Sequence, residues 1–127
     1  MLDHISIQAA DVDEATGFYL DVMGPLGFRE AMRHTDGDVT VVGISGFDGF
    51  PRFWLGPQVD PGTRPIHLAF TAPSREAVDQ VHVRAVARGT EILHEPREWP
   101  EYHPNYYGVF LRDPDGNNIE AVCHTES

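Results

Sequence analysis

The sequence contains no lysine, because all nine of its basic residues are arginines. A protein without lysine cannot use a lysine Schiff base or a lysine nucleophile. Cysteine is almost as scarce: Cys123 is the only one, and a single cysteine cannot form a disulfide within the chain. Lysine-based covalent catalysis and a disulfide-stabilised scaffold are therefore both excluded.

Positive charge is also in short supply, with 9 basic against 20 acidic residues and a formal net charge of −11. The acidic residues are spread along the chain, and such a charge opposes binding to nucleic-acid phosphates and to anionic lipids. No segment has the roughly 18 apolar residues of a membrane span, or the residue order of a signal peptide. We expect a cytoplasmic protein that has neither nucleic acid nor membrane as a partner.

What the sequence does contain is enough for one ordinary domain. Its 127 residues, 41% of them apolar, are close to the globular average and can form a hydrophobic core without disulfides. Strand-like alternation and helix-like spacing follow one another in the order βαβββ, and after a segment rich in glycine and proline the same order begins again. The expected boundaries are about 1–56 for the first module, about 57–64 for the linker and about 65–127 for the second module.

In each module one helix follows the first strand. The first predicted helix, residues 11–23, has acidic residues in its first turn. The second, residues 74–89, has Ser74 as its N-cap and Gly89 as its stop. The predicted strands are residues 2–9, 25–34, 38–45 and 50–56 in the first module and residues 66–72, 90–96, 106–113 and 117–124 in the second.

The two modules align at their first strands, "DHISIQA" and "IHLAFTA", so that His67 has in the second module the place of His4 in the first. Both predicted helices begin shortly after these strands. This internal duplication predicts two similar units packed side by side, each with a helix over one sheet face and the other face open to a shared cavity.

Alternation along three strands places metal-binding side chains on the open faces. His4, His67 and Glu120 each lie on the less apolar face of their strand. A glutamate inside a strand needs a partner, because an unpaired buried carboxylate is costly. Two imidazole nitrogens and one carboxylate oxygen suit Fe, Mn, Co, Ni or Zn, and they leave positions open for substrate or water. We therefore predict that these three residues bind a divalent metal cation.

Four segments, "DHISI", "FYLDVMGPLGF", "IHLAF" and "YYGVFLRDPDGNNIEAV", resemble the vicinal oxygen chelate superfamily over nearly the whole chain. That superfamily includes glyoxalase I, extradiol dioxygenases, fosfomycin-resistance thiol transferases and bleomycin-binding proteins. The resemblance implies a single α+β domain in which two tandem βαβββ modules form a cup-shaped mixed sheet with the helices on its outer face. It also assigns His4, His67 and Glu120 to the metal-ligand positions, in agreement with strand alternation.

The sequence departs from two branches of this superfamily. Glyoxalases have a fourth ligand, a glutamate from the strand before the linker, whereas "FDGFPRFWLG" offers only Asp48. Extradiol and fosfomycin enzymes commonly have a tyrosine ten residues before the last ligand, where this chain has Phe110. Tyr106 and Gly108 share the face of Phe110, so Tyr106 is our candidate for a catalytic hydroxyl and His103 for a proton-transfer group.

Substrate binding is assigned to Phe110, Trp54 and Arg52, because Arg52 and Trp54 share one strand face and suit an anionic or aromatic ligand. An ordinary sheet rim explains Arg52 and Trp54 equally well, and a solvated loop explains His103. Packing at the sheet edge explains Tyr102, Tyr106 and Tyr107 as well as substrate contact does, and only Tyr106 is also favoured by strand alternation. Cys123 falls on the face opposite Glu120 and is interpreted as a small core residue. The histidines without a motif, which we expect at the surface, are His34, His82, His94 and His124.

Two classes of function fit these observations. The first is a metal-dependent enzyme of the lyase, isomerase or dioxygenase type, whose small substrate chelates the cation through two neighbouring oxygens. The second is a protein that sequesters an antibiotic or metabolite, as bleomycin-resistance proteins do, with weak metal binding or none. Bleomycin-type binders usually lack the ligand trio, so its presence favours the enzyme. The family often dimerises, and we expect a homodimer.

Overall fold

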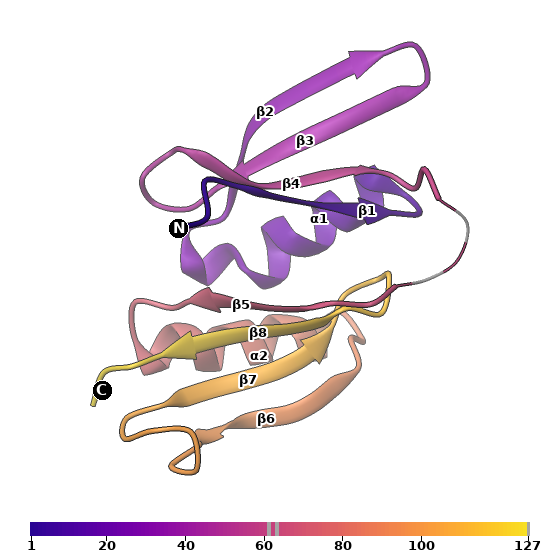
Figure 1. Ribbon diagram of the computed structural model, residues 1–127. Coiled ribbons are helices and arrows are strands. Elements are labelled where there is room, and N and C mark those ends of the chain that lie inside the picture. Colours follow the sequence, from indigo (N-terminus) through magenta and orange to yellow (C-terminus); the bar gives the residue numbers. More distant parts are fainter. Residues whose placement is uncertain (61, 63, 127) are drawn as a thin grey trace. The chain divides into compact units, whose positions relative to one another are not determined.

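The computed structural model describes residues 1–60, 62 and 64–126, and Figure 1 shows their arrangement as a ribbon. The chain divides into two compact units, Met1–Arg64 and Pro65–Ser127. They are called the N-terminal and C-terminal units below, and each is described by itself. Residues 61 and 63 of the predicted linker lie outside the described residues. A single-domain organisation of the two units stays a prediction.

The N-terminal unit is a four-stranded mixed sheet with one helix. Its strands follow the order β1-β4-β3-β2, in which β1 and β4 are parallel and the other neighbours antiparallel. Strand β1 begins at Ile5, so that His4 lies directly before the strand and not inside it. The elements are β1 (Ile5–Ala9), α1 (Val12–Val22), the 3-10 turn η1 (Gly24–Leu26), β2 (Arg29–Asp36), β3 (Val39–Ser45) and β4 (Pro51–Pro57).

The C-terminal unit repeats this topology. Its sheet has the order β5-β8-β7-β6, again with one parallel pair, β5 with β8, and two antiparallel pairs. The predicted order of two βαβββ modules is therefore confirmed. The elements are β5 (His67–Thr71), α2 (Arg75–Ala87), β6 (Ile92–Glu98), β7 (Tyr107–Arg112) and β8 (Asn118–Cys123).

Both helices begin at capping residues. The Asp11 carboxylate accepts a hydrogen bond from the backbone N–H of Glu14 (3.0 Å), and the Ser74 hydroxyl accepts one from that of Ala77 (3.1 Å). Each bond satisfies an N–H group that has no partner within the first helical turn. Gly89, with φ +75°, follows the end of α2 as predicted. The short turn η1 was not predicted.

The hydrophobic core of the C-terminal unit lies between α2 and one face of its sheet (Figure 1). The helix contributes Val78 and Val81, which are fully buried. Strands β7 and β8 contribute alternate residues, including Val109 and Ile119, and Cys123 is a buried core residue as predicted. The opposite face, away from α2, is left for the side chains considered next. Among the described residues, no helix has the length and apolar character needed to cross a membrane.

Candidate metal centre

Glu120 is a carboxylate on the sheet face turned away from α2. It belongs to β8, where it pairs with Ala69 of β5 on one side and with Phe110 of β7 on the other. Only 1% of the residue is exposed. Its two oxygens have different partners: Oε1 lies 3.2 Å from Nε2 of His67, and Oε2 accepts a short hydrogen bond from the Tyr106 hydroxyl. A carboxylate withdrawn from water in this way needs such partners.

His67, the first residue of β5, presents a defined nitrogen to this carboxylate. Its Nδ1 lies 3.0 Å from the backbone oxygen of Asn118, which can only accept, so we assign the proton of the neutral ring to Nδ1. Nε2 then has a free lone pair. A metal-binding histidine typically donates its other N–H to a carbonyl or a carboxylate in this manner.

The 3.2 Å separation of His67 Nε2 and Glu120 Oε1 brings two acceptors together when the ring is neutral. Either a second proton on the ring or a cation between the two atoms relieves their repulsion. Two ligand atoms that each lie about 2.0–2.2 Å from the same zinc-like ion are about 3–3.5 Å apart when the angle between them at the ion is right or tetrahedral. The pair therefore fits two adjacent positions around a divalent cation.

The turn "DPDGN" between β7 and β8 holds this pair in register. Asp113 Oδ1 accepts hydrogen bonds from the backbone N–H groups of Asp115 and Asn117, both at 2.9 Å. Asn117 Oδ1 in turn accepts from the N–H of Ile66 (2.9 Å), the residue before His67. The turn thus fixes the start of β5 against the start of β8. Sequence analysis recognised the motif but missed this role of Asp113 and Asn117.

Tyr106, directly before β7, reaches Glu120 across a glycine. A Cβ atom at Gly108 would lie 3.1 Å from Glu120 Oε2 and 3.5 Å from Tyr106 Cε1, so the missing side chain leaves space for the hydrogen bond. Burial, and secondly the hydrogen bond to the carboxylate, raise the pKa of Tyr106 well above its ordinary value. At neutral pH Tyr106 is therefore a phenol that donates a proton to Glu120 in a hydrogen bond.

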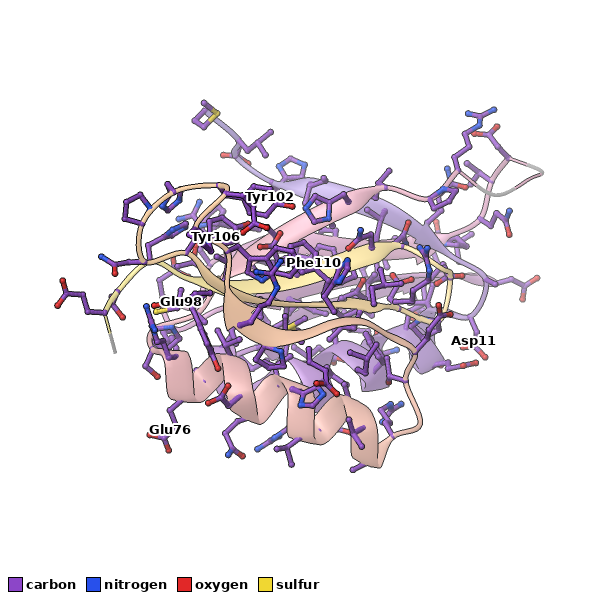
Figure 2. The ribbon with its side chains drawn as sticks, turned by 90° about the horizontal axis from the view of Figure 1, so that it is seen from below. Asp11, Glu76, Glu98, Tyr102, Tyr106 and Phe110 are labelled. Atoms are coloured by element: carbon purple, nitrogen blue, oxygen red, sulfur yellow. The ribbon has the colours of Figure 1, made fainter. Side chains whose placement is uncertain are left out.

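An aromatic cluster surrounds these residues on the same face. Figure 2 shows Tyr102, Tyr106 and Phe110 on the side of the C-terminal unit's sheet that faces away from Glu76 of α2. The ring of Phe110 stacks on His67, with centroids 5.9 Å apart and planes at 15°. Sequence analysis missed several members, because their contacts depend on the loop between β6 and β7. The further ring contacts in this cluster involve His94, Trp99, His103 and His124.

The predicted proton-transfer residue His103 lies at the exposed edge of this cluster. Its ring contacts Tyr106 edge to face, with centroids 5.0 Å apart, and stacks on His124 at 4.7 Å. His124, His94 and His34 are exposed as expected, whereas His82 is half-buried on α2. No contact between His103 and Glu120 is present among the described residues, so a proton from His103 would have to pass through Tyr106 or solvent.

His4 repeats in the N-terminal unit the arrangement seen at His67. Its Nδ1 lies 2.7 Å from Oδ1 of Asp3, so a neutral ring again has Nε2 free. The structure brings His67 and Glu120 together, whereas His4 belongs to the other unit. Within the described residues no group of three or more His, Cys, Asp or Glu side chains is placed to hold a metal. The three-residue site stays a prediction.

The fold repeat shows which residue stands in place of a fourth ligand. In β1, Ser6 is two residues after His4 and pairs with Trp54, just as Ala69, two residues after His67, pairs with Glu120. Trp54 therefore occupies in the N-terminal unit the position of Glu120. Its indole N–H donates to the backbone oxygen of Pro51 at 2.9 Å.

Arg52, a candidate for substrate binding, and Asp48, considered for the fourth ligand position, are paired with each other. Arg52 is exposed, contacts Asp48 Oδ2 at 3.2 Å and lies over the ring of Phe50. The backbone N–H of Phe50, and then Arg52, lower the pKa of Asp48. Asp48 is thus an exposed turn carboxylate bound to arginine, and substrate binding by Arg52, Trp54 or Phe110 stays a prediction.

Residues 1–121 match the family described as the Glyoxalase/Bleomycin resistance protein/Dioxygenase superfamily. The chain belongs to this superfamily. A protein of Bacillus subtilis (strain 168), the uncharacterized protein YqjT, is 27% identical over 133 residues, which cover 96% of this chain and 98% of YqjT. The predicted membership is thus confirmed.

Solved structures of this superfamily have the same fold. A glyoxylase/bleomycin resistance protein/dioxygenase domain from Frankia sp. EAN1pec is 20% identical, with a TM-score of 0.76 and coverage of 97% of this chain and 96% of that one. A glyoxalase/bleomycin resistance protein from Albidiferax ferrireducens T118 is 25% identical, with a TM-score of 0.70 and coverage of 96% and 97%. The superfamily includes lyases and dioxygenases, and its members often bind divalent metals.

Proposed function

We propose that this superfamily member is a metal-dependent enzyme whose small substrate chelates a divalent cation through two neighbouring oxygens. The observation that carries the proposal is the pair of His67 Nε2 and the buried Glu120 Oε1 at 3.2 Å, with Nδ1 of the histidine already engaged by a backbone carbonyl. Fe, Mn, Co, Ni or Zn suit this donor set. His4, equivalent to His67 in the repeat, is the proposed third ligand.

The bound cation would supply Lewis-acid stabilisation of negative charge on the substrate oxygens, as lyase, isomerase and dioxygenase reactions of this type require. The chain's own groups have supporting tasks. Phe110 stacks on one face of the His67 ring, whose side chain stays half exposed, and the Tyr106 hydroxyl holds a proton at Glu120 Oε2. Tyr106 is the proposed hydroxyl at the reaction centre. His103, beside it at the exposed edge, is proposed to exchange protons with solvent.

Substrate contacts are proposed for Phe110 in the C-terminal unit and for Trp54 and Arg52 in the N-terminal unit. Phe110 is apolar and nearly buried, which suits the hydrocarbon part of a ligand, whereas Arg52 is exposed and suits an anionic group. We also propose a homodimer, because members of the family often dimerise, and a location in the cytoplasm, because the sequence shows neither a signal peptide nor a membrane span. Light scattering of the purified chain tests the homodimer.

Metal analysis and thermal unfolding test the proposed function. Purified protein should take up one divalent cation per chain, and excess Mn²⁺, Co²⁺, Ni²⁺ or Zn²⁺ should raise its unfolding temperature, since a ligand at 100 times its Kd stabilises by about 2.7 kcal/mol. Glu120→Gln, His67→Ala and His4→Ala should each abolish the shift. His34→Ala, at an exposed histidine of β2, is the matched control and should retain it.

The outcome separates three cases. Loss of the shift in the three ligand variants alone supports the full site, and activity screens with hemithioacetals, catechols and fosfomycin plus thiols would then define the reaction. A shift that survives His4→Ala limits the ligands to the C-terminal unit. No uptake and no shift in the wild type contradict the proposal.

A metal-free binding protein is the second candidate, and one observation favours it. Tyr102 is 56% exposed, and its ring lies nearly parallel to that of Trp99, with planes at 11° and centroids 5.7 Å apart. Such a surface can stack on a planar ligand without a metal. Binding of an antibiotic that carries a planar aromatic group, such as bleomycin, would support this alternative. It can be measured by quenching of tryptophan fluorescence in the presence of a chelator.

A further inference from the structure

We propose that Tyr106 is a positioning residue that engages one oxygen of Glu120, so that the carboxylate offers only Oε1 to a bound cation. This inference rests on the proposed function, because it concerns the same metal. It assigns to Tyr106 a role that acts through Glu120, in addition to any contact with substrate.

The first step is the division of the two carboxylate oxygens. Oε2 accepts the Tyr106 hydroxyl hydrogen, and Oε1 points to His67 Nε2. A carboxylate with both oxygens free can bind a metal through either one or both. Glu120 could use both only after breaking the bond to Tyr106, and at 1% exposure water would not replace that bond.

The second step is that packing fixes the position of the hydroxyl. The ring of Tyr106 meets the rings of Tyr102, His103 and His124 edge to face, with centroids 5.1, 5.0 and 5.3 Å away. Gly108 beneath it leaves the space in which the hydroxyl meets Oε2. The hydroxyl is therefore held in place before any cation arrives, which is the usual task of residues behind a metal ligand.

The third step links this arrangement to the substrate. In an octahedral site, three protein ligands with one donor atom each leave three positions, which accommodate two neighbouring substrate oxygens and one further ligand. If Glu120 used both oxygens, only two positions would remain. By reserving Oε2, Tyr106 keeps the third position open, so that the cation can hold a chelating substrate and one further ligand at the same time.

The test compares two neighbouring tyrosines in the Co²⁺-loaded protein. Tyr106→Phe keeps the ring but removes the hydroxyl, whereas Tyr107→Phe removes a hydroxyl that donates to Asp79 of α2 at 2.6 Å. We expect Tyr106→Phe to change the visible absorption of Co²⁺, because Oε2 then replaces another ligand of the ion. It should also lower the affinity for acetohydroxamate, a chelator with two neighbouring oxygens, about tenfold, because only two positions are left for exchangeable ligands. Tyr107→Phe should change neither.

Gly108→Ala tests the same contact without changing Tyr106, because the added Cβ at 3.1 Å from Oε2 requires the carboxylate to shift slightly. It serves as the second variant if Tyr106→Phe does not fold, and it should alter the Co²⁺ spectrum. Co²⁺ spectra and acetohydroxamate affinity that match the wild type in either folded variant overturn the positioning role while the metal site stands. Absence of Co²⁺ binding in the wild type overturns the proposed function and this inference together.

Discussion

Two glycines leave space for larger side chains on neighbouring strands, one in each unit. Gly108 leaves space for the contact between Tyr106 and Glu120. Gly43 of β3 leaves space for the indole of its cross-strand partner Trp54. Neither glycine has a positive φ, so the requirement is for space and not for an unusual backbone. The two open sheet faces thus differ in chemistry: where one carries a carboxylate, the other carries an indole.

Gly43→Ala should lower the free energy of unfolding by about 1–3 kcal/mol, as overpacking does. The added Cβ would lie 2.8 Å from Trp54 Cη2 and 3.0 Å from Pro51 Cβ, so the indole must move. Urea unfolding measures the change, and Trp54 fluorescence reports the displaced ring. Gly46→Ala is the control, since no atom lies within 4 Å of its Cβ, and its effect should stay within about 0.5 kcal/mol. Equal effects of the two changes would contradict this interpretation of Gly43.

Strand pairing, and not proximity in sequence, brings the candidate ligands together. Strand β5 pairs with β8 in parallel, which sets His67 opposite Asn118 and Ala69 opposite Glu120. That register depends on the turn before β8, because Asn117 bonds both to Asp113 in the turn and to Ile66 beside His67. A side chain in a turn thereby positions a histidine 50 residues earlier in the chain.

Asn117→Ala should therefore weaken metal binding as well as folding. It removes the bonds to Ile66 N–H and to Asp113 Oδ2, both at 2.9 Å and largely buried, and we expect a loss of about 2–3 kcal/mol in unfolding free energy. Co²⁺ affinity should fall as well, because the start of β5 loses its anchor. Ser74→Ala, which removes the α2 cap at a cost of about 1 kcal/mol, should leave Co²⁺ affinity unchanged. If both variants bind Co²⁺ as the wild type does, Asn117 has no role in positioning His67.

Sequence patterns predicted the elements well but not the contacts made by loops. Alternation identified the open face of β8, and the structure confirms that Glu120 lies there with Phe110 beside it. The capping residue Ser74 was recognised because helix caps obey a local rule. The partner of the Tyr106 hydroxyl and the cluster around Trp99 could not be predicted, because they depend on the fold of residues 99–106 and on its packing against β8.

The chain as a whole has the same fold twice with different residues at equivalent places. Both modules keep an equivalent histidine, His4 directly before β1 and His67 as the first residue of β5. Each has Nδ1 engaged, by Asp3 in one and by the backbone oxygen of Asn118 in the other. Only the second module keeps the carboxylate. Trp54 stands at the equivalent place in the first module, so the ligands proposed above are one histidine from the first module and the histidine and glutamate of the second.

If all three proposed ligands bind the same cation, that cation should protect both modules at once. In hydrogen exchange of the full chain, Co²⁺ or Zn²⁺ should slow exchange of the amides of β1 near His4 as well as those of β5 and β8, because a metal that binds only the folded state suppresses local opening wherever its ligands lie. In His4→Ala the slowing should disappear from β1, β5 and β8 alike, because the proposed site has then lost one of its three ligands. His34→Ala, on the exposed strand β2, should behave as the wild type. Protection confined to β5 and β8 in the wild type would show that His4 is no ligand, and the site would then consist of His67 and Glu120 of the C-terminal unit.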